Sequence, residues 1–418
     1  MWGWLQGRGA GGRKLLKIGK RLMDFSYTPE QEAFRAELRG WLDARRQARA
    51  IPQGASTDLD EFVSHGRRWQ RELHEGGWCG VHWPVEYGGR GTGLIEQIIF
   101  QEELARAASP QLVNLLALSM VGPLLIEHGS RAHKERYLKK ILTAEEIWCQ
   151  GFSEPGAGSD LASVSTRAVA DGDTYRVSGQ KVWTSFAQYA DFCLLLVRTD
   201  VQAAKHQGLS MLIVDMRSQG VQTKPLRQMN GDSEFNEVFF DEVSVPRHNL
   251  VGEENQGWSM ALAMLMYERA TLTFQRQLQS RVALEDLLHF AREFAPGGKT
   301  AASDPLLRQR LAWAYTESEA LRLTSLRHLT KQLKGSPPGP EGSMEKLFWS
   351  EMFQRMLEVA MSVAGPYSQL AAGDPHAPMQ GHWPHMYLYS RGRTIAAGSS
   401  EIQRGIIAQR VLGLPKDR

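Results

Sequence analysis

Residues 151–160 read Gly151-Phe152-Ser153-Glu154-Pro155-Gly156-Ala157-Gly158-Ser159-Asp160, and this stretch is the most informative in the sequence. Its glycines can turn backbone N–H groups toward one point and its hydroxyls add donors, so it suits phosphate oxygens. It is not a Walker A loop, because no Gly-Lys-Ser/Thr follows and an aspartate stands where a lysine is needed. Taken alone, a surface turn is the simpler interpretation, since glycine and proline most often mark turns.

Short apolar segments follow this stretch. They lie around residues 175–177, 192–198, 209–216 and 234–245, and Gly, Asp and Pro separate them. This pattern is typical of β-strands. We therefore predict a middle β domain over residues 147–256.

The residues on both sides of this domain have helical periodicity. Thr28, Pro29 and Gln31 form a capping box that starts the first helix. The helical period returns after Gly257, and Gly413 suits the end of the last helix. The predicted fold is mainly α with a middle β domain: an N-terminal helical domain (23–146), the β domain, and a C-terminal helical bundle (257–418).

The bulk composition excludes several classes of protein. A chain of 418 residues with 42% hydrophobic content exceeds one ordinary core, so two or three domains are expected. Its net charge of +3 comes from residues 1–22, which hold six basic residues and no acid. The remainder has 43 basic against 46 acidic residues, which gives no support for nucleic-acid binding.

The basic leader, residues 1–22, lies outside the predicted fold. It is either a targeting segment or upstream sequence with the natural start at Met23, and the second reading is preferred because serine is lacking. We expect a cytoplasmic protein, or one of the mitochondrial matrix if the leader is a transit peptide. The longest apolar stretch, 112–126, contains Pro123 and falls short of the roughly 20 residues that span a bilayer.

The three cysteines predict neither a metal site nor a disulfide framework. Cys79, Cys149 and Cys193 stand in no CxxC or related spacing. A reducing compartment is the simpler interpretation.

Five ordered blocks resemble the acyl-CoA dehydrogenase family. The first, 152–160, is similar to the family signature, and the second, Gly179-Gln180-Lys181-Val182-Trp183-Thr184-Ser185, is similar to its second flavin-contacting strand. The others are 235–240 with Val245-Pro246, 252–258, and 398–404 with 411–415. The resemblance covers residues 25–415.

This resemblance implies an N-terminal helical domain, a β-barrel-like middle domain and a C-terminal four-helix bundle, with FAD between the last two and a neighbouring subunit. Ser159 would also reach toward the substrate. A tryptophan beside a turn usually packs in a core, but the block match puts Trp183 against the flavin. The flavin-binding residues implied are Gln150, Phe152, Ser153, Gly158, Ser159, Trp183, Thr184, Ser185, Ser399 and Glu401.

The desaturation of an acyl-CoA needs a base for the α proton, and the hydride chemistry belongs to the cofactor. Many members carry a glutamate just before the glycine of the last block, but this chain has Ala397 there. A smaller set carries a glutamate followed by an arginine on the first long C-terminal helix. The resemblance then implies that Glu268 is the base and that Arg269 shapes the substrate pocket.

The residues themselves point the same way. No charged residue occurs from Trp258 to Tyr267, so Glu268 and Arg269 are the first ionisable groups after an apolar run. A charge in such a setting is costly unless compensated, and is often functional. The alternative is that the pair lies on the solvated rim of an amphipathic helix.

Two family blocks are altered. Residues 294–305 replace an Arg-x-x-Phe-Gly block, and residues 361–365 replace a Gln-x-x-Gly-Gly loop. These departures resemble a bacterial-type branch with bulky acyl-CoA substrates and, in some members, unlike subunits.

The partners implied are an acyl-CoA, an electron-transferring flavoprotein, and a second copy or an unlike subunit in a dimer or tetramer. Two alternatives are a flavin monooxygenase or oxidase on the same fold, and a structural subunit of a mixed tetramer.

Overall fold

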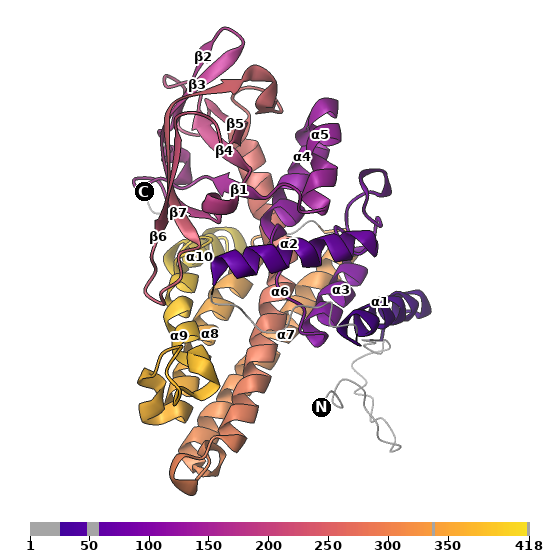
Figure 1. The fold of residues 1–418 in the computed structure, drawn as a ribbon, viewed down its shortest axis with the longest axis vertical. Coiled ribbons are helices and arrows are strands. Elements are labelled where there is room, and N and C mark those ends of the chain that lie inside the picture. Colours follow the sequence, from indigo (N-terminus) through magenta and orange to yellow (C-terminus); the bar gives the residue numbers. More distant parts are fainter. Residues whose placement is uncertain (1–25, 48–57, 337–338, 416–418) are drawn as a thin grey trace.

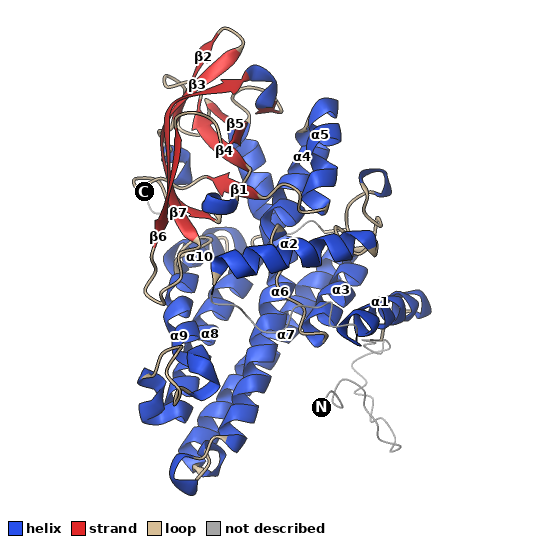
Figure 2. Ribbon diagram, in the orientation of Figure 1, coloured by secondary structure: helices blue, strands red, loops and turns tan. Residues whose placement is uncertain are grey.

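The computed structural model describes residues 26–47, 58–336 and 339–415, without the side chains of residues 267–273. The predicted leader lies outside this part of the chain. Helices come first, then a β-sheet, then helices again (Figures 1 and 2). The predicted fold class is confirmed.

The first N-terminal helix begins at a capping box. The Thr28 N–H donates to Gln31 Oε1 at 3.0 Å, and the Gln31 N–H donates to Thr28 Oγ1 at 3.3 Å, so the predicted capping box is present. The helices are α1 (Pro29–Gln47), α2 (Leu59–Glu75), α3 (Leu94–Arg106), α4 (Gly122–His128) and α5 (Arg131–Leu142).

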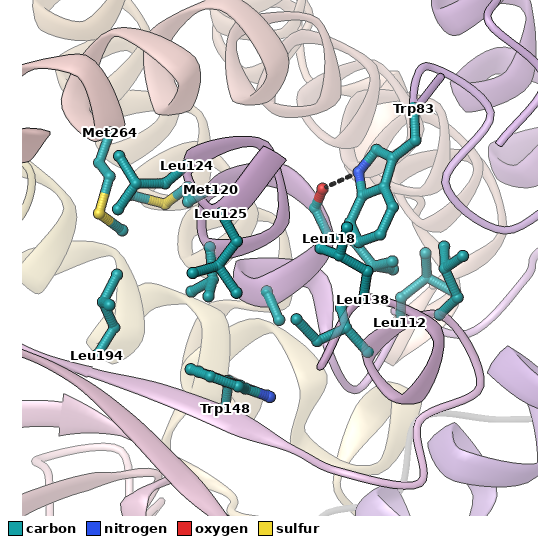
Figure 3. Close-up of a cluster of buried hydrophobic side chains, with 14 of the residues drawn as sticks. Trp83, Leu112, Leu118, Met120, Leu124, Leu125, Leu138, Trp148, Leu194 and Met264 are labelled. Atoms are coloured by element: carbon teal, nitrogen blue, oxygen red, sulfur yellow. Dashed lines mark hydrogen bonds between the residues drawn. The ribbon is translucent and has the colours of Figure 1, made fainter. Parts of the chain in front are cut away.

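A π-helical turn, η2 (Ala117–Val121), leads into α4. Its last hydrogen bond runs from the Gly122 N–H to the Ala117 carbonyl, five residues back. The next residue, Pro123, has no N–H to donate. The turn therefore leaves the Leu118 carbonyl without a backbone donor, and the indole N–H of Trp83 donates to that carbonyl at 2.9 Å (Figure 3).

The middle of the chain forms one sheet in the order β6-β7-β3-β2-β4-β5-β8, with β1 parallel to β4. Two β-bulges interrupt the antiparallel pairing of β3 with β7. The strands are β1 (Trp148–Gly151), β2 (Arg167–Asp171), β3 (Thr174–Ser185), β4 (Phe192–Arg198), β5 (Leu209–Asp215), β6 (Val221–Leu226), β7 (Phe235–Pro246) and β8 (Leu250–Val251).

The strand predicted at 192–198 is confirmed as β4, and its continuous apolar sequence has a structural reason. Leu194 and Leu196 face one core, which includes residues of the N-terminal helices and α6. Cys193 and Leu195 face a second core, which the curved sheet encloses. Because both faces are buried, no polar alternation is required.

Residues of three parts of the chain meet on the face of β4 that carries Leu194 and Leu196. Figure 3 shows Leu125 of α4, Met264 of α6 and Trp148 of β1 in this cluster, and all three side chains are buried. The N-terminal helices, the sheet and the start of the C-terminal bundle therefore share one core.

The C-terminal bundle has its own core, to which Leu287, Leu357 and Trp383 belong. Figure 1 shows α6 running from the sheet to the far end of this bundle. The helices are α6 (Gly257–Glu293), α7 (Pro305–Leu333), α8 (Gly342–Ala364), α9 (His382–Ser390) and α10 (Ser400–Ile406), which continues as the π turn Ile407–Val411. Among the helices in the described ranges, none has both the length and the apolar character to cross a membrane.

Candidate active site

The loop after β1 closes on itself through its backbone. The Glu154 N–H donates to the Ala157 carbonyl and the Ala157 N–H to the Glu154 carbonyl, both at 3.0 Å, around a turn at Pro155 and Gly156. The loop is also joined to β3, because the Val182 N–H donates to the Ser153 carbonyl at 2.9 Å. The first two predicted flavin blocks therefore lie against each other.

A buried ion pair strengthens this junction. Lys181 Nζ lies 2.8 Å from Glu154 Oε1 and 3.0 Å from the Phe152 carbonyl oxygen. The Glu154 carboxylate also accepts from the Ser165 N–H, the Ser165 hydroxyl and the Thr166 N–H. Every charge in the pair is thus compensated.

The pKa values of the pair leave both groups charged at neutral pH. Burial alone would raise the pKa of Glu154, but Lys181 and the neighbouring donors lower it to about 2. Burial lowers the pKa of Lys181 to about 8, and Glu154 limits the fall. The loop is therefore held to β3 by an ionised pair.

The indole of Trp183 stands on the surface of the sheet. One of the two bulges lies between Lys181 and Thr184, and it gives β3 one more residue than β7. Trp183 has φ +61° and is 59% exposed, and its ring meets Phe235 edge-on with centroids 6.0 Å apart. The interpretation of Trp183 as an ordinary core residue is therefore wrong.

The other residues of this block lie beside the indole. Thr184 is buried, and its Oγ1 has no hydrogen-bond partner among the described residues. Its carbonyl accepts from Asn236 Nδ2 at 3.0 Å. Ser185 pairs with Phe235 of β7 and is half-buried. The bulge thus brings an exposed aromatic ring and an unsatisfied hydroxyl together.

The remaining predicted residues of the first block differ in exposure. Phe152 is buried, and Gln150 is half-buried on β1 opposite Leu194. Gly158 and Ser159 are exposed. A β-carbon on Gly158 would meet no atom within 4 Å, so space is open on this side of the loop.

The predicted residues of the last block lie in the C-terminal bundle. Ser399 caps α10, because its hydroxyl accepts from the Ile402 N–H at 3.3 Å. Hydrogen bonds from the backbone of Glu401 and from Ser399 lower the pKa of the Glu401 carboxyl. Both residues line a cleft of about 440 Å³ between α8 and α10, which also contains Glu351, Glu358 and Arg404.

The hydrogen bonds of this last block run within the bundle. Lys346 Nζ donates to the Gly398 carbonyl at 2.7 Å, and Gln403 Nε2 donates to the Ala397 carbonyl at 2.9 Å. The structure thus brings together the first two blocks, while Ser399 and Glu401 belong to a separate cleft.

Glu268 and Arg269 lie within α6, but their side chains are outside the described residues. The backbone position is informative. Residues four and seven apart share one face of an α-helix. Met264 and Ala261, which precede Glu268 at these spacings, are both fully buried.

The sequence reasoning missed the Glu154–Lys181 pair, although a signal was present. Tyr175 and Val177 alternate with polar residues along β3 and are buried. The same alternation places Lys181 on the inner face, where an unpaired lysine would be very costly. A buried carboxylate partner could have been expected from this pattern.

Comparisons with known proteins agree with this architecture. Three family models match: acyl-CoA dehydrogenase N-terminal domain (28–145), middle domain (149–243) and C-terminal domain (255–412). Acyl-CoA dehydrogenase IpdE1 of Mycobacterium tuberculosis is 40% identical over 92% of this chain and 98% of its own length.

Two solved structures are similar over nearly the whole chain. A structure titled Tcur3481-Tcur3483 steroid ACAD has a TM-score of 0.82 and 29% identity, over 94% of this chain and 100% of its own. The ChsE4-ChsE5 complex from Mycobacterium tuberculosis has a TM-score of 0.80 and 33% identity, over the same shares. The chain belongs to the acyl-CoA dehydrogenase family.

Proposed function

We propose that this protein catalyses the FAD-dependent α,β-dehydrogenation of an acyl-CoA thioester to the 2-enoyl-CoA, with Glu268 as the base. One observation carries the proposal: residues 152–160 and 179–185 lie against each other, and the exposed indole of Trp183 stands beside their junction. Such a surface suits a flat aromatic cofactor, because ring faces stack and exclude water.

The residues present fit a flavin. Thr184 Oγ1 is a buried hydroxyl with no partner in the part of the chain that the structure describes, and the space beside Gly158 is open. The unsatisfied hydroxyl would be unusual in a purely structural surface, where buried polar groups are satisfied. We propose that Ser153, Ser159, Thr184 and Ser185 hold the ring and Trp183 covers it, with Gln150 and Phe152 beside them. Ser399 and Glu401, which line the separate cleft of the bundle, would contact the cofactor away from its ring.

Glu268 would remove the α proton. Its place on α6 follows the buried Ala261 and Met264 at helical spacing, which supports a position on the inward face. Burial of a carboxylate raises its pKa toward the range in which it abstracts a proton efficiently at neutral pH. When bound, the flavin would supply the acceptor for the β hydrogen. Arg269 would shape the substrate pocket from the next position of the helix.

The substrate and partners belong to the same proposal. A bulky acyl group fits the name steroid ACAD of one similar structure. An unlike second subunit fits the two-protein titles of both similar structures, while a dimer or tetramer of identical chains is the other assembly. We propose an electron-transferring flavoprotein as acceptor and the cytoplasm as location, since the similar relatives are bacterial.

The test is to purify the chain alone, record its flavin absorbance, and follow bleaching by acyl-CoA esters without oxygen. Straight-chain and ring-bearing esters should bleach the flavin, and pivaloyl-CoA, which has no α hydrogen, should not. Reduction by NADH alone would indicate a monooxygenase. A chain without flavin would indicate a structural subunit.

A further inference from the structure

A small cavity of about 50 Å³ lies between α3, η2 and α6. Its wall is mostly apolar and includes Ile98, Leu112, Leu118 and Phe274. Phe274 follows Glu268 by six residues, which is about 9 Å along a helix. The cavity therefore lies next to the stretch of α6 that carries the proposed base.

His82 also lines this cavity, and one of its ring nitrogens is unsatisfied. Nε2 is buried and has no hydrogen-bond partner among the described residues. The Leu118 backbone acts on the ring to raise its pKa, and because Nε2 has no partner it does so from the Nδ1 side. Burial lowers the pKa of His82 to about 4, so the ring is neutral at physiological pH.

The π turn explains which nitrogen carries the proton. The Leu118 carbonyl has no backbone donor, because the Gly122 N–H bonds to Ala117 and Pro123 has no N–H. A carbonyl only accepts, so its influence on the ring favours the tautomer with the proton on His82 Nδ1. In a neutral imidazole the second nitrogen is then a bare acceptor. Nε2 thus presents a lone pair in a mostly apolar cavity, which Gln97, Gln101 and Ser119 also line.

We propose that His82 Nε2 accepts a hydrogen bond from a hydroxyl group on the acyl portion of the substrate, and so selects hydroxylated acyl-CoA esters. This inference rests on the proposed acyl-CoA dehydrogenase activity. A hydroxyl satisfies the buried acceptor, whereas a methyl group in the same place leaves it unsatisfied. Sites of this kind discriminate strongly against an analogue that lacks the polar group.

The experiment compares ω-hydroxyacyl-CoA esters with the unsubstituted esters of the same length, from octanoyl to dodecanoyl. Binding to the purified protein is measured by calorimetry, and flavin bleaching is followed in parallel. At one chain length the hydroxylated ester should bind about 10- to 100-fold more tightly. The position of this optimum then measures the distance from the thioester to His82.

Three variants distinguish the loss of the hydrogen-bond acceptor from a change in the shape of the cavity. His82→Phe should bring the two affinities within about twofold of each other, and His82→Gln, whose amide oxygen can accept, should retain part of the preference. Ile98→Val changes an apolar wall residue and should weaken both esters equally, leaving their ratio unchanged. Thermal unfolding of each variant identifies loss of fold.

Equal binding of both esters at every length would overturn the inference, and would mean that water satisfies Nε2. A hydroxyl preference that survives in folded His82→Phe would overturn it as well. If the esters bind but none bleaches the flavin, the proposed function fails while the calorimetric ratio still decides the role of His82. If unsubstituted esters bleach the flavin and the ratio is one, only the role of His82 fails.

Discussion

Lys181 Nζ lies 2.8 Å from Glu154 Oε1, and the two side chains are 0% and 5% exposed. The pair links the loop of the family signature to the strand that carries Trp183. A buried pair of this kind adds little net stability compared with an apolar pair, but breaking it leaves one charge buried alone. The geometry of the proposed flavin surface therefore depends on both partners.

Lys181→Met should lower the free energy of unfolding by about 3–5 kcal/mol, because Glu154 loses its countercharge. Urea denaturation measures this loss. The control is Lys205→Met, which removes an ion pair with Asp160 whose side chains are 48% and 59% exposed. That loss should be much smaller, because solvent screens an exposed pair. Equal effects of the two substitutions would contradict the role of burial.

The Glu154 carboxylate should add to the acid sensitivity of the fold. Its pKa is lowered from 4.5 to about 2, so its contribution is present above pH 4.5 and is lost as the pH falls toward 2. The corresponding loss in the free energy of unfolding is on the order of 3 kcal/mol. Unfolding of wild type and Glu154→Gln is compared from pH 6 downward, at about half-unit steps. Parallel pH profiles would show that Glu154 titrates normally.

Trp183→Gly should weaken FAD binding by at least about tenfold while leaving the fold as stable or up to about 1 kcal/mol more stable. The ring is exposed, and its positive φ is strained for any residue with a β-carbon. Glu242→Gly is a matched control, since Glu242 has φ +48° at the other bulge of the same strand pair. It should gain similar stability with unchanged FAD affinity. Retention of full FAD affinity by Trp183→Gly would exclude the indole from the site.

Glu268→Gln should retain FAD and slow bleaching by acyl-CoA at least about 10²–10⁴-fold, the usual range for loss of a general base. Stopped-flow absorbance without oxygen measures the rate. Glu293→Gln, at the other end of α6 with a side chain 66% exposed, serves as control and should react at the wild-type rate. A fast Glu268→Gln enzyme would require another base.

Features set by neighbouring residues were predictable from the sequence. The Thr28–Gln31 capping box depends on a four-residue segment, and the strand at 192–198 depends on a continuous apolar run. The edge strand β6 was not predicted, because it contains Pro225 and none of its side chains is buried, which obscures its pattern. Proline is tolerated there since an edge strand pairs on one side only.

Features that depend on register between distant segments were not predictable. Glu154 and Lys181 are 27 residues apart, and their contact requires the loop to fold back on β3. Alternation along β3 alone would turn Trp183 inward, like Lys181, and only the bulge turns it outward. The bulge involves pairing with β7, more than 50 residues away.

The close approach between Gly257 and Ser210 fixes the start of α6 against the sheet. A β-carbon on Gly257 would lie 2.7 Å from the Ser210 backbone, so the first residue of the helix is pressed directly against β5. From this contact the helix extends 37 residues, or about 55 Å, into the bundle. Because any side chain at position 257 would push the start of α6 away from β5, Gly257 fixes where the helix, and with it the proposed base, lies relative to the sheet.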